Sequence, residues 1–165
     1  MSRTAADFSL SLVRELEGVK RELALFHDDA AVWTTIPGIT NSAGNLALHL
    51  AGNLQYFIGT VLGRTGYVRN RELEFGRTSW SRAEIYAELD AAIAIVSRVL
   101  PSISDATLDQ EFPEAVMGSK FRTGTFLVHL VAHAGFHLGQ AGYLRRVLTG
   151  DATSSGPIPL GPLAL

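Results

Sequence analysis

The chain has 165 residues, of which 47% are hydrophobic, 18% are charged and none is cysteine, and its formal net charge is −2. This length predicts one domain, and the high apolar content with a small net charge excludes a disordered chain. Without cysteine there is no disulfide framework, no thiolate metal site and no cysteine nucleophile. The balanced charge gives no electrostatic footprint for nucleic acid. The five histidines are therefore the main chemical resource.

The first segment with a helical period covers residues 5–27. Its apolar stripe, spaced by three or four residues, comprises Phe8, Leu12, Leu16, Val19, Leu23 and Phe26. The charged residues of this segment lie mostly off the stripe, so we expect them on a solvated face: Glu15, Glu17, Lys20, Arg21 and Glu22. The sequence therefore predicts an amphipathic helix with one face in a core.

A second helical stretch follows the break at Pro37–Gly38. Asn41 or Ser42 is expected to cap this helix, which runs to about residue 64. Its stripe comprises Leu46, Leu50, Asn53, Phe57 and Val61. Residues 65–80 contain several arginines and are interpreted as a solvated polar loop. A basic patch for an anionic ligand is the alternative interpretation of that loop.

The third helix is predicted from Ser81, which forms a capping-box pattern with Glu84, to just before Pro101. Residues 101–122 are irregular, with a tight turn expected at 117–120. The fourth helix is predicted over residues 125–148 and ends at Gly150. Four amphipathic helices in residues 1–150 predict an all-α four-helix bundle. The Pro- and Gly-containing tail, residues 151–165, is expected to be non-helical and to pack over a groove or against a second subunit.

Two uncharged stretches, residues 30–63 and 123–144, are long enough to span a membrane. Both contain many histidine, asparagine or glutamine residues, which are costly in lipid. We interpret them as the inner segments of the bundle, and we expect no membrane partner. The N-terminal segment has no long apolar run, so no secretory signal is expected and the predicted location is cytoplasmic.

The fourth predicted helix carries the pattern with the most chemical information. Its stripe forms a heptad seam that is expected to face the core, and it comprises Phe126, Leu130, His133, His137, Gln140, Leu144 and Val147. A buried polar group without a partner costs roughly 1–3 kcal/mol, so the two imidazoles need partners. A metal ion shared by side chains one helical turn apart is one solution. A buried polar network is the alternative.

His129 extends this pattern to a series of three histidines, but the two ends of the series lie about 12 Å apart along a helix. Metal–nitrogen bonds of about 2.1 Å cannot span that distance. Only one adjacent pair can therefore share an ion, and the seam selects His133 and His137. His49, on the uncharged second helix, is the natural third ligand. His27 is expected at the end of the first helix, and His129 is left as a neighbouring group.

Three neutral imidazoles around one divalent ion leave open positions for water or substrate. Zinc fits these ligands, and imidazole also suits nickel and iron. The segments HLVAH and HAGFH lack the glutamate of the HExxH protease motif. No fourth ligand is evident in the sequence, and this favours a catalytic metal over a structural one.

The segments NSAGNLALHLAGN and HLVAHAGFHLGQAGYLRRVL resemble the DinB-like superfamily, which includes YfiT-like metal-dependent hydrolases and bacillithiol transferases. The resemblance extends from the first helix to about residue 148. It implies a four-helix bundle that is commonly dimeric, with metal ligands at His49, His133 and His137. Gln140 matches the glutamine of the family's HxxxHxGQ element and is expected to orient a ligand or a metal-binding group. Phe136 stands where relatives often have another histidine, which alters the rim of the pocket.

Characterised relatives include thiol-dependent transferases and isomerases. The resemblance therefore implies a metal-dependent enzyme, either a thiol-dependent S-transferase or a related hydrolase, with a small-molecule substrate and a bound divalent ion, zinc or nickel. Any thiol must be a low-molecular-weight cosubstrate because the chain has no cysteine. A homodimer is expected. The alternative is a non-catalytic metal- or ligand-binding homodimeric bundle.

Overall fold

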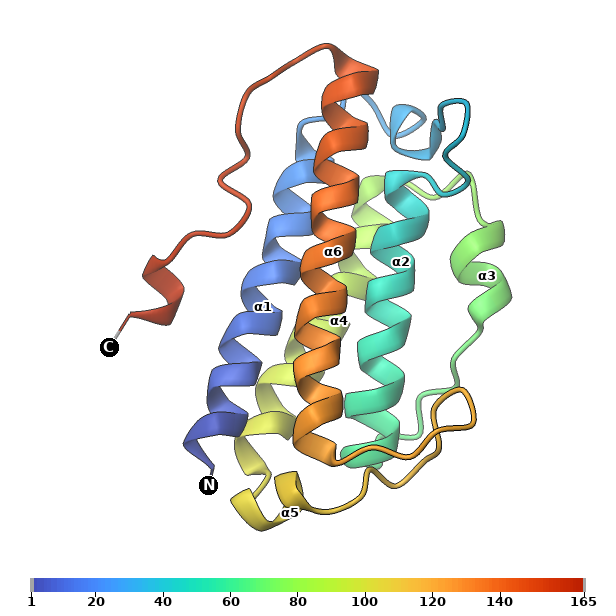
Figure 1. Cartoon of the computed structure of the whole chain (residues 1–165). Coiled ribbons are helices and arrows are strands. Elements are labelled where there is room, and N and C mark those ends of the chain that lie inside the picture. The colour runs from blue at the N-terminus through green and yellow to red at the C-terminus, as the bar shows by residue number, and fades with distance from the viewer. Residues whose placement is uncertain (1, 165) are drawn as a thin grey trace.

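The computed structural model describes residues 2–164, and four long helices lie side by side along most of its length (Figure 1). Their bounds are α1 Arg3–Ala24, α2 Ala43–Leu54, α4 Arg82–Val99 and α6 Thr123–Thr149. In cross-section they form a ring in which α1 contacts α4 and α6, and α2 contacts the same two helices. The predicted all-α fold is confirmed. No helix among residues 2–164 is long and apolar enough to cross a membrane.

Shorter elements connect the long helices. α2 continues directly into a π-helix, Gln55–Leu62, and the two short α-helices are α3, Arg71–Gly76, and α5, Asp105–Asp109. Single 3₁₀ turns lie at Ala31–Trp33, Leu100–Ser102 and Gly161–Leu163. In the irregular connection before α6, Val116 pairs with Ser119 around a turn at Met117–Gly118, so the tight turn expected there is present.

The predicted helix starts are present for α2 and α4. Ser42 accepts a hydrogen bond from the backbone N–H of Asn45, whose side chain bonds back in a capping box. Ser81 and Glu84 make the same arrangement at α4. These caps satisfy backbone donors that would otherwise have no partner in the first turn. The C-terminal end of α6 lies at Gly150, which has a φ of 67°. This is a left-handed conformation that glycine adopts without strain.

Each long helix contributes apolar side chains to one continuous core. The predicted stripe of α1 is mostly buried, and the core residues of α1 and α4 include Leu12, Leu16, Leu23, Ile85, Leu89 and Val96. All twelve residues of α2 are buried, because α1, α3, α4 and α6 all contact it. This explains why the second helix has no charged residue.

Two acidic residues of α1 contradict the expectation of a fully solvated charged face. Glu15 is only 3% exposed and Glu22 only 1%. Glu22 is buried because it accepts a hydrogen bond from Arg145 of α6, at 3.0 Å, and both partners lie inside the protein. The ion pair supplies the charge compensation that a buried carboxylate requires. The helical period alone does not reveal such pairing.

The predicted seam of α6 is only partly buried. Phe126, Leu130 and Leu144 of the seam face inward, together with Leu127, Ala134, Leu138 and Ala141. His133 and His137 are half-buried at the edge of this face, Gln140 is exposed and Val147 is 60% exposed. The histidines therefore line the seam between α2 and α6 and remain accessible to a ligand.

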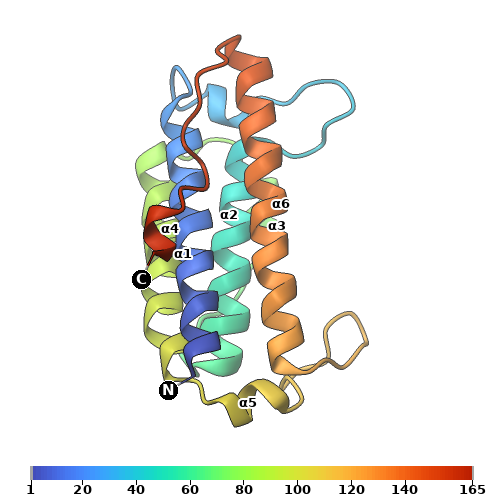
Figure 2. The same cartoon turned by 60° about the vertical axis from the view of Figure 1, so that its left-hand side comes forward.

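The C-terminal tail packs against the helices. After α6 the chain turns back and runs along α1 (Figures 1 and 2). Arg145 donates to the backbone oxygens of Asp151 and Thr153, and Arg21 donates to the backbone oxygen of Pro157. The tail thus packs against its own chain, and it contains one 3₁₀ turn although no helical structure was expected there.

Candidate metal centre

Three imidazoles converge at the seam between α2 and α6. His49 comes from the middle of α2, and His133 and His137 lie one turn apart on α6. The Nε2 atom of His133 is 3.2 Å from Nε2 of His49 and 3.0 Å from Nε2 of His137, and the three ligand atoms all lie within 4.8 Å of one another. Two nitrogens bound to one ion by bonds of about 2.1 Å at tetrahedral angles are roughly 3.4 Å apart. The cluster therefore has close to the dimensions of a three-histidine metal site.

Glu74 fixes the protonation of the first imidazole. Its Oε2 atom lies 2.9 Å from Nδ1 of His49, and both oxygens also accept from Arg69, at 2.6 and 2.8 Å. Arg69, which can only donate, also lies 3.2 Å from Nδ1, but the contact with the carboxylate, which can only accept, is shorter. The shorter contact assigns the proton to Nδ1 and leaves the lone pair on Nε2. Burial raises the pKa of Glu74, but the hydrogen bonds from Arg69 and His49 outweigh burial and leave this pKa below its ordinary value.

Gln140 fixes the protonation of the third imidazole, that of His137. Its Oε1 atom lies 2.7 Å from Nδ1 of His137, so that nitrogen donates and Nε2 again carries a lone pair. His133 lies between the other two, and its Nδ1 is buried without a hydrogen-bond partner. Since His49 and His137 both present lone pairs, a proton on Nε2 of His133 could satisfy only one of its two contacts. A cation at the centre satisfies all three nitrogens.

Two of the imidazoles, those of His133 and His137, are also held neutral. Burial, and after it the neighbouring imidazoles of His137 and His49, lower the pKa of His133 to about 3. Burial lowers the pKa of His137 as well, against a smaller opposing effect of its hydrogen bond to Gln140. A neutral imidazole is the form that binds a metal ion, so the site is ready for a cation near neutral pH.

The family model described as the DinB superfamily matches residues 12–141, a range that includes all three histidines. The chain belongs to the DinB superfamily. No curated protein and no solved structure matches it significantly. Membership agrees with the resemblance seen in the sequence, and with a histidine cluster that could hold a metal ion.

In this DinB-superfamily chain the position of Glu74 depends on two residues of α2. The side-chain amide of Asn45 donates to three backbone oxygens at the end of α3, those of Glu74, Phe75 and Arg77. Gly52 leaves room for the carboxylate, because a Cβ at this position would lie 2.3 Å from Oε1 of Glu74. The same helix that carries His49 therefore also fixes the carboxylate that orients it.

The structure brings together the three histidines proposed from the sequence and leaves the other two outside. His129 is exposed on α6, and its ring stacks 5.8 Å from that of His133. His27 is exposed just beyond the end of α1. Neither belongs to the cluster, and no Asp, Glu or Cys in residues 2–164 joins the three imidazoles as a fourth ligand.

Sequence reasoning missed Arg69 and Glu74. Both lie in residues 65–80, interpreted as a solvated loop, where the structure instead forms α3 and buries Glu74 to 5% exposure. The alternative of a basic patch is also wrong for Arg69, because its guanidinium is paired with Glu74. The one available signal was Asn70, a residue type favoured at helix N-termini, whose side chain accepts from the backbone N–H of Leu73.

Proposed function

We propose that this protein is a metal-dependent enzyme in which His49, His133 and His137 bind one divalent ion, zinc or nickel, through Nε2. The leading activity is transfer of a low-molecular-weight thiol to an electrophilic small molecule, with hydrolysis as the related possibility. The observation that carries this proposal is the pair of hydrogen bonds from Nδ1 of His49 and His137, because they turn lone pairs toward a common centre.

When bound, a divalent ion lowers the pKa of a thiol or water in its open position and so supplies a nucleophile near neutral pH. The charge around the histidines supports this role. All three donors are imidazoles, no carboxylate among residues 2–164 joins them as a ligand, and Glu74, which contacts His49, is paired with Arg69. The protein therefore does not offset the positive charge of the ion, and its acidifying effect on a bound nucleophile is retained.

The hydrogen bonds already made by Glu74 favour a thiol over water as the bound nucleophile. Both oxygens of Glu74 are occupied by Arg69 and His49, so this carboxylate is not available to remove a proton from a nucleophile. A free thiol has a pKa of about 8.5, whereas that of bulk water is about 15.7. A thiol therefore needs much less help from a general base, and this site provides little.

Metal analysis tests the ligand set. Protein purified without a nickel column should contain about one divalent ion per chain, as one three-histidine site requires. His133→Ala should abolish binding, while His129→Ala, on the exposed neighbouring turn, should keep it. Retention of metal by His133→Ala, or loss only in His129→Ala, would contradict the assignment.

A reaction screen tests the activity. Metal-loaded protein is mixed with bacillithiol, mycothiol or glutathione and a panel of electrophiles, and thiol consumption is followed. We expect a rate enhancement with at least one thiol that disappears in His133→Ala. Metal binding without enhancement for any thiol or any hydrolysable ester would favour the alternative of a non-catalytic metal-binding protein.

A further inference from the structure

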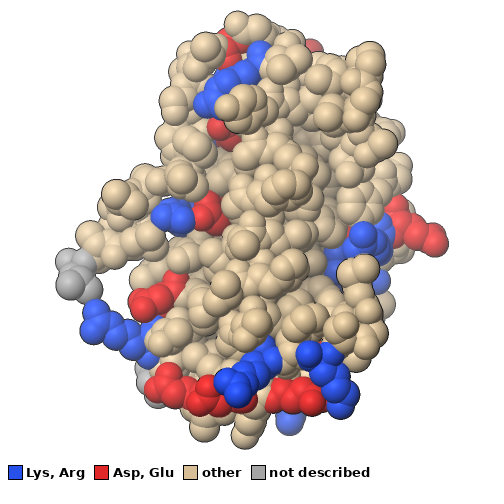
Figure 3. Space-filling view, in the orientation of Figure 1, with Lys and Arg blue, Asp and Glu red and all other residues tan. Residues whose placement is uncertain are grey.

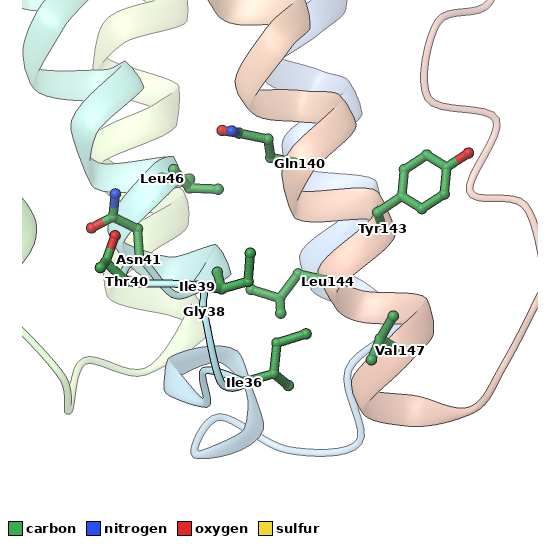
Figure 4. A pocket seen from close by; sticks show the side chains of 10 residues that line it. All are labelled: Ile36, Gly38, Ile39, Thr40, Asn41, Leu46, Gln140, Tyr143, Leu144 and Val147. Atoms are coloured by element: carbon green, nitrogen blue, oxygen red, sulfur yellow. The ribbon is translucent and has the colours of Figure 1, made fainter.

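A cavity of about 420 Å³ opens beside the candidate metal centre. It lies between the start of α2, the second half of α6 and the connecting segment before α2 (Figure 4). Its walls are formed by Ile36, Gly38, Ile39, Thr40, Asn41, Leu46, Gln140, Tyr143, Leu144 and Val147. This size falls within the range of small-molecule sites, about 300–1,000 Å³.

The cavity and the histidine cluster are neighbours on both helices. Leu46 lies one turn before His49 on α2, and Gln140 lies one turn after His137 on α6. Gln140 is shared, because it lines the cavity and hydrogen-bonds Nδ1 of His137. From His137 to Val147 the helix rises about 15 Å. A ligand bound at the cluster can therefore extend along α6 into this cavity.

The chemistry of the cavity is apolar. Leu46 and Leu144 form a buried floor, at 4% and 5% exposure, and Ile39 and Val147 leave apolar surface exposed at the rim. In Figure 4 Gln140 is directed toward α2, whereas the ring of Tyr143 points away from it. None of the lining residues is charged. In Figure 3 the middle of the face is mostly uncharged, whereas charged side chains gather at its lower end, at its edges and in a small group near its upper end.

One part of the rim is held in a defined conformation. The backbone N–H of Ile39 donates to the oxygen of Ile36 at 2.9 Å, and Gly38 has a φ of 84°. With Pro37 before it, this is a turn of type II, which requires glycine or asparagine at the third position. The turn fixes Ile36 and Ile39 on the cavity wall, so the apolar rim exists before any ligand binds.

We propose that this cavity binds the uncharged, apolar part of a ligand whose donor atom occupies the open position at the three histidines. This inference rests on the proposed metal site and extends its substrate class beyond the polar thiols of the screen above, to a compound with a nucleophilic or metal-binding head and a hydrophobic chain or ring. A charged tail would lose its hydration in a cavity that offers no opposite charge.

Binding of straight-chain thiols to the cobalt(II)-substituted protein tests the proposal. Ethanethiol, 1-butanethiol and 1-hexanethiol share one head group, and the sulfur-to-cobalt charge-transfer absorption reports binding without turnover. We expect affinity to rise about fourfold for each added methylene that enters the cavity.

Two exposed valines of α6 provide matched variants. Val147 lines the cavity and is 60% exposed, while Val128 is 55% exposed and lies outside it. Val147→Asp should flatten the dependence on chain length, since the charge penalty acts on the buried chain. Val128→Asp should keep the parent dependence.

Equal affinity for ethanethiol and 1-hexanethiol in the parent protein, or equal chain-length dependence in the two variants, would overturn the proposal and leave the metal site intact. A protein that binds cobalt but shows no thiolate absorption with any thiol would instead refute the thiol-accepting centre, and this inference with it.

Discussion

Two Arg–Glu pairs with buried carboxylates lie on different sides of the molecule, one beside α3 and one between α1 and α6 (Figure 1), and they differ in the other groups that they bind. Arg69 and Glu74 are five residues apart, and the carboxylate also accepts from Nδ1 of His49. Arg145 and Glu22 are 123 residues apart and join α6 to α1. Here the remaining guanidinium donors bind backbone oxygens of the tail, and Ser155 donates to the second oxygen of Glu22.

The difference shows that an Arg–Glu pair can either orient a metal-binding side chain or hold a backbone segment in place. The pair at the histidines leaves a carboxylate lone pair for an imidazole and so sets the direction of a ligand atom. In the pair at the tail, the guanidinium of Arg145 donates to backbone oxygens and so fixes the path of residues 151–157. Affinity for metal should depend on the first pair, and stability should depend most on the second.

Removing the tail pair is expected to have the largest effect. Arg145→Ala leaves Glu22 as an uncompensated buried charge, which typically costs about 3–5 kcal/mol. Urea denaturation of the metal-free variant measures this loss of unfolding free energy. The neighbouring Arg146→Ala, in which a partly exposed arginine is removed, should cost less than about 1 kcal/mol. Equal losses in the two variants would contradict the assigned role of Arg145.

Neutralising the other pair should act on metal affinity. Glu74→Gln removes the charge that holds His49 with its Nδ1 proton, and loss of such an orienting group typically weakens binding by about 10- to 100-fold. Competition with a chromophoric chelator measures the dissociation constant. Glu72→Gln, on an exposed position of the same short helix, serves as the control and should bind as the parent does.

If Glu74→Gln bound metal with unchanged affinity and only lowered the unfolding free energy, both ion pairs would be structural. The comparison between the two sides of the molecule would then fail.

A smaller effect should appear with pH. His133 in the folded protein has its pKa lowered to about 3, whereas an unfolded histidine titrates near 6.5. Below pH 6.5 the unfolded state therefore binds a proton that the folded state does not, and the metal-free protein should lose stability as the pH falls toward 3. Urea midpoints at pH 7 and pH 5 measure this slope. His133→Gln should have a shallower slope, and an unchanged slope would exclude His133 as its source.

The sequence indicated the long helices and the three converging histidines because both depend on short-range patterns. Helical periods and capping residues such as Ser42 and Ser81 located α2 and α4, and the four-residue spacing of His133 and His137 put both rings on one face. The uncharged character of α2 pointed to burial, and the structure buries His49 to 4% exposure.

The groups that support the site were not predictable in the same way. Glu74 lies on a helix of six residues, too short to show a period, and its burial depends on Gly52 and Arg69. Glu22 looked solvated because its partner, Arg145, is on another helix far along the chain. The spacing of residues within one segment does not show that a charged residue there pairs with one on a distant segment.

The contact between His49 and His133 joins two positions 84 residues apart in a chain without cysteine. A cation held there would act as a reversible cross-link between the early and late halves of the fold. Its contribution would grow with the concentration of free ion, as for any ligand that binds only the native state. The seam between α2 and α6 would then tighten or loosen with metal supply, a dependence that a permanent disulfide does not have.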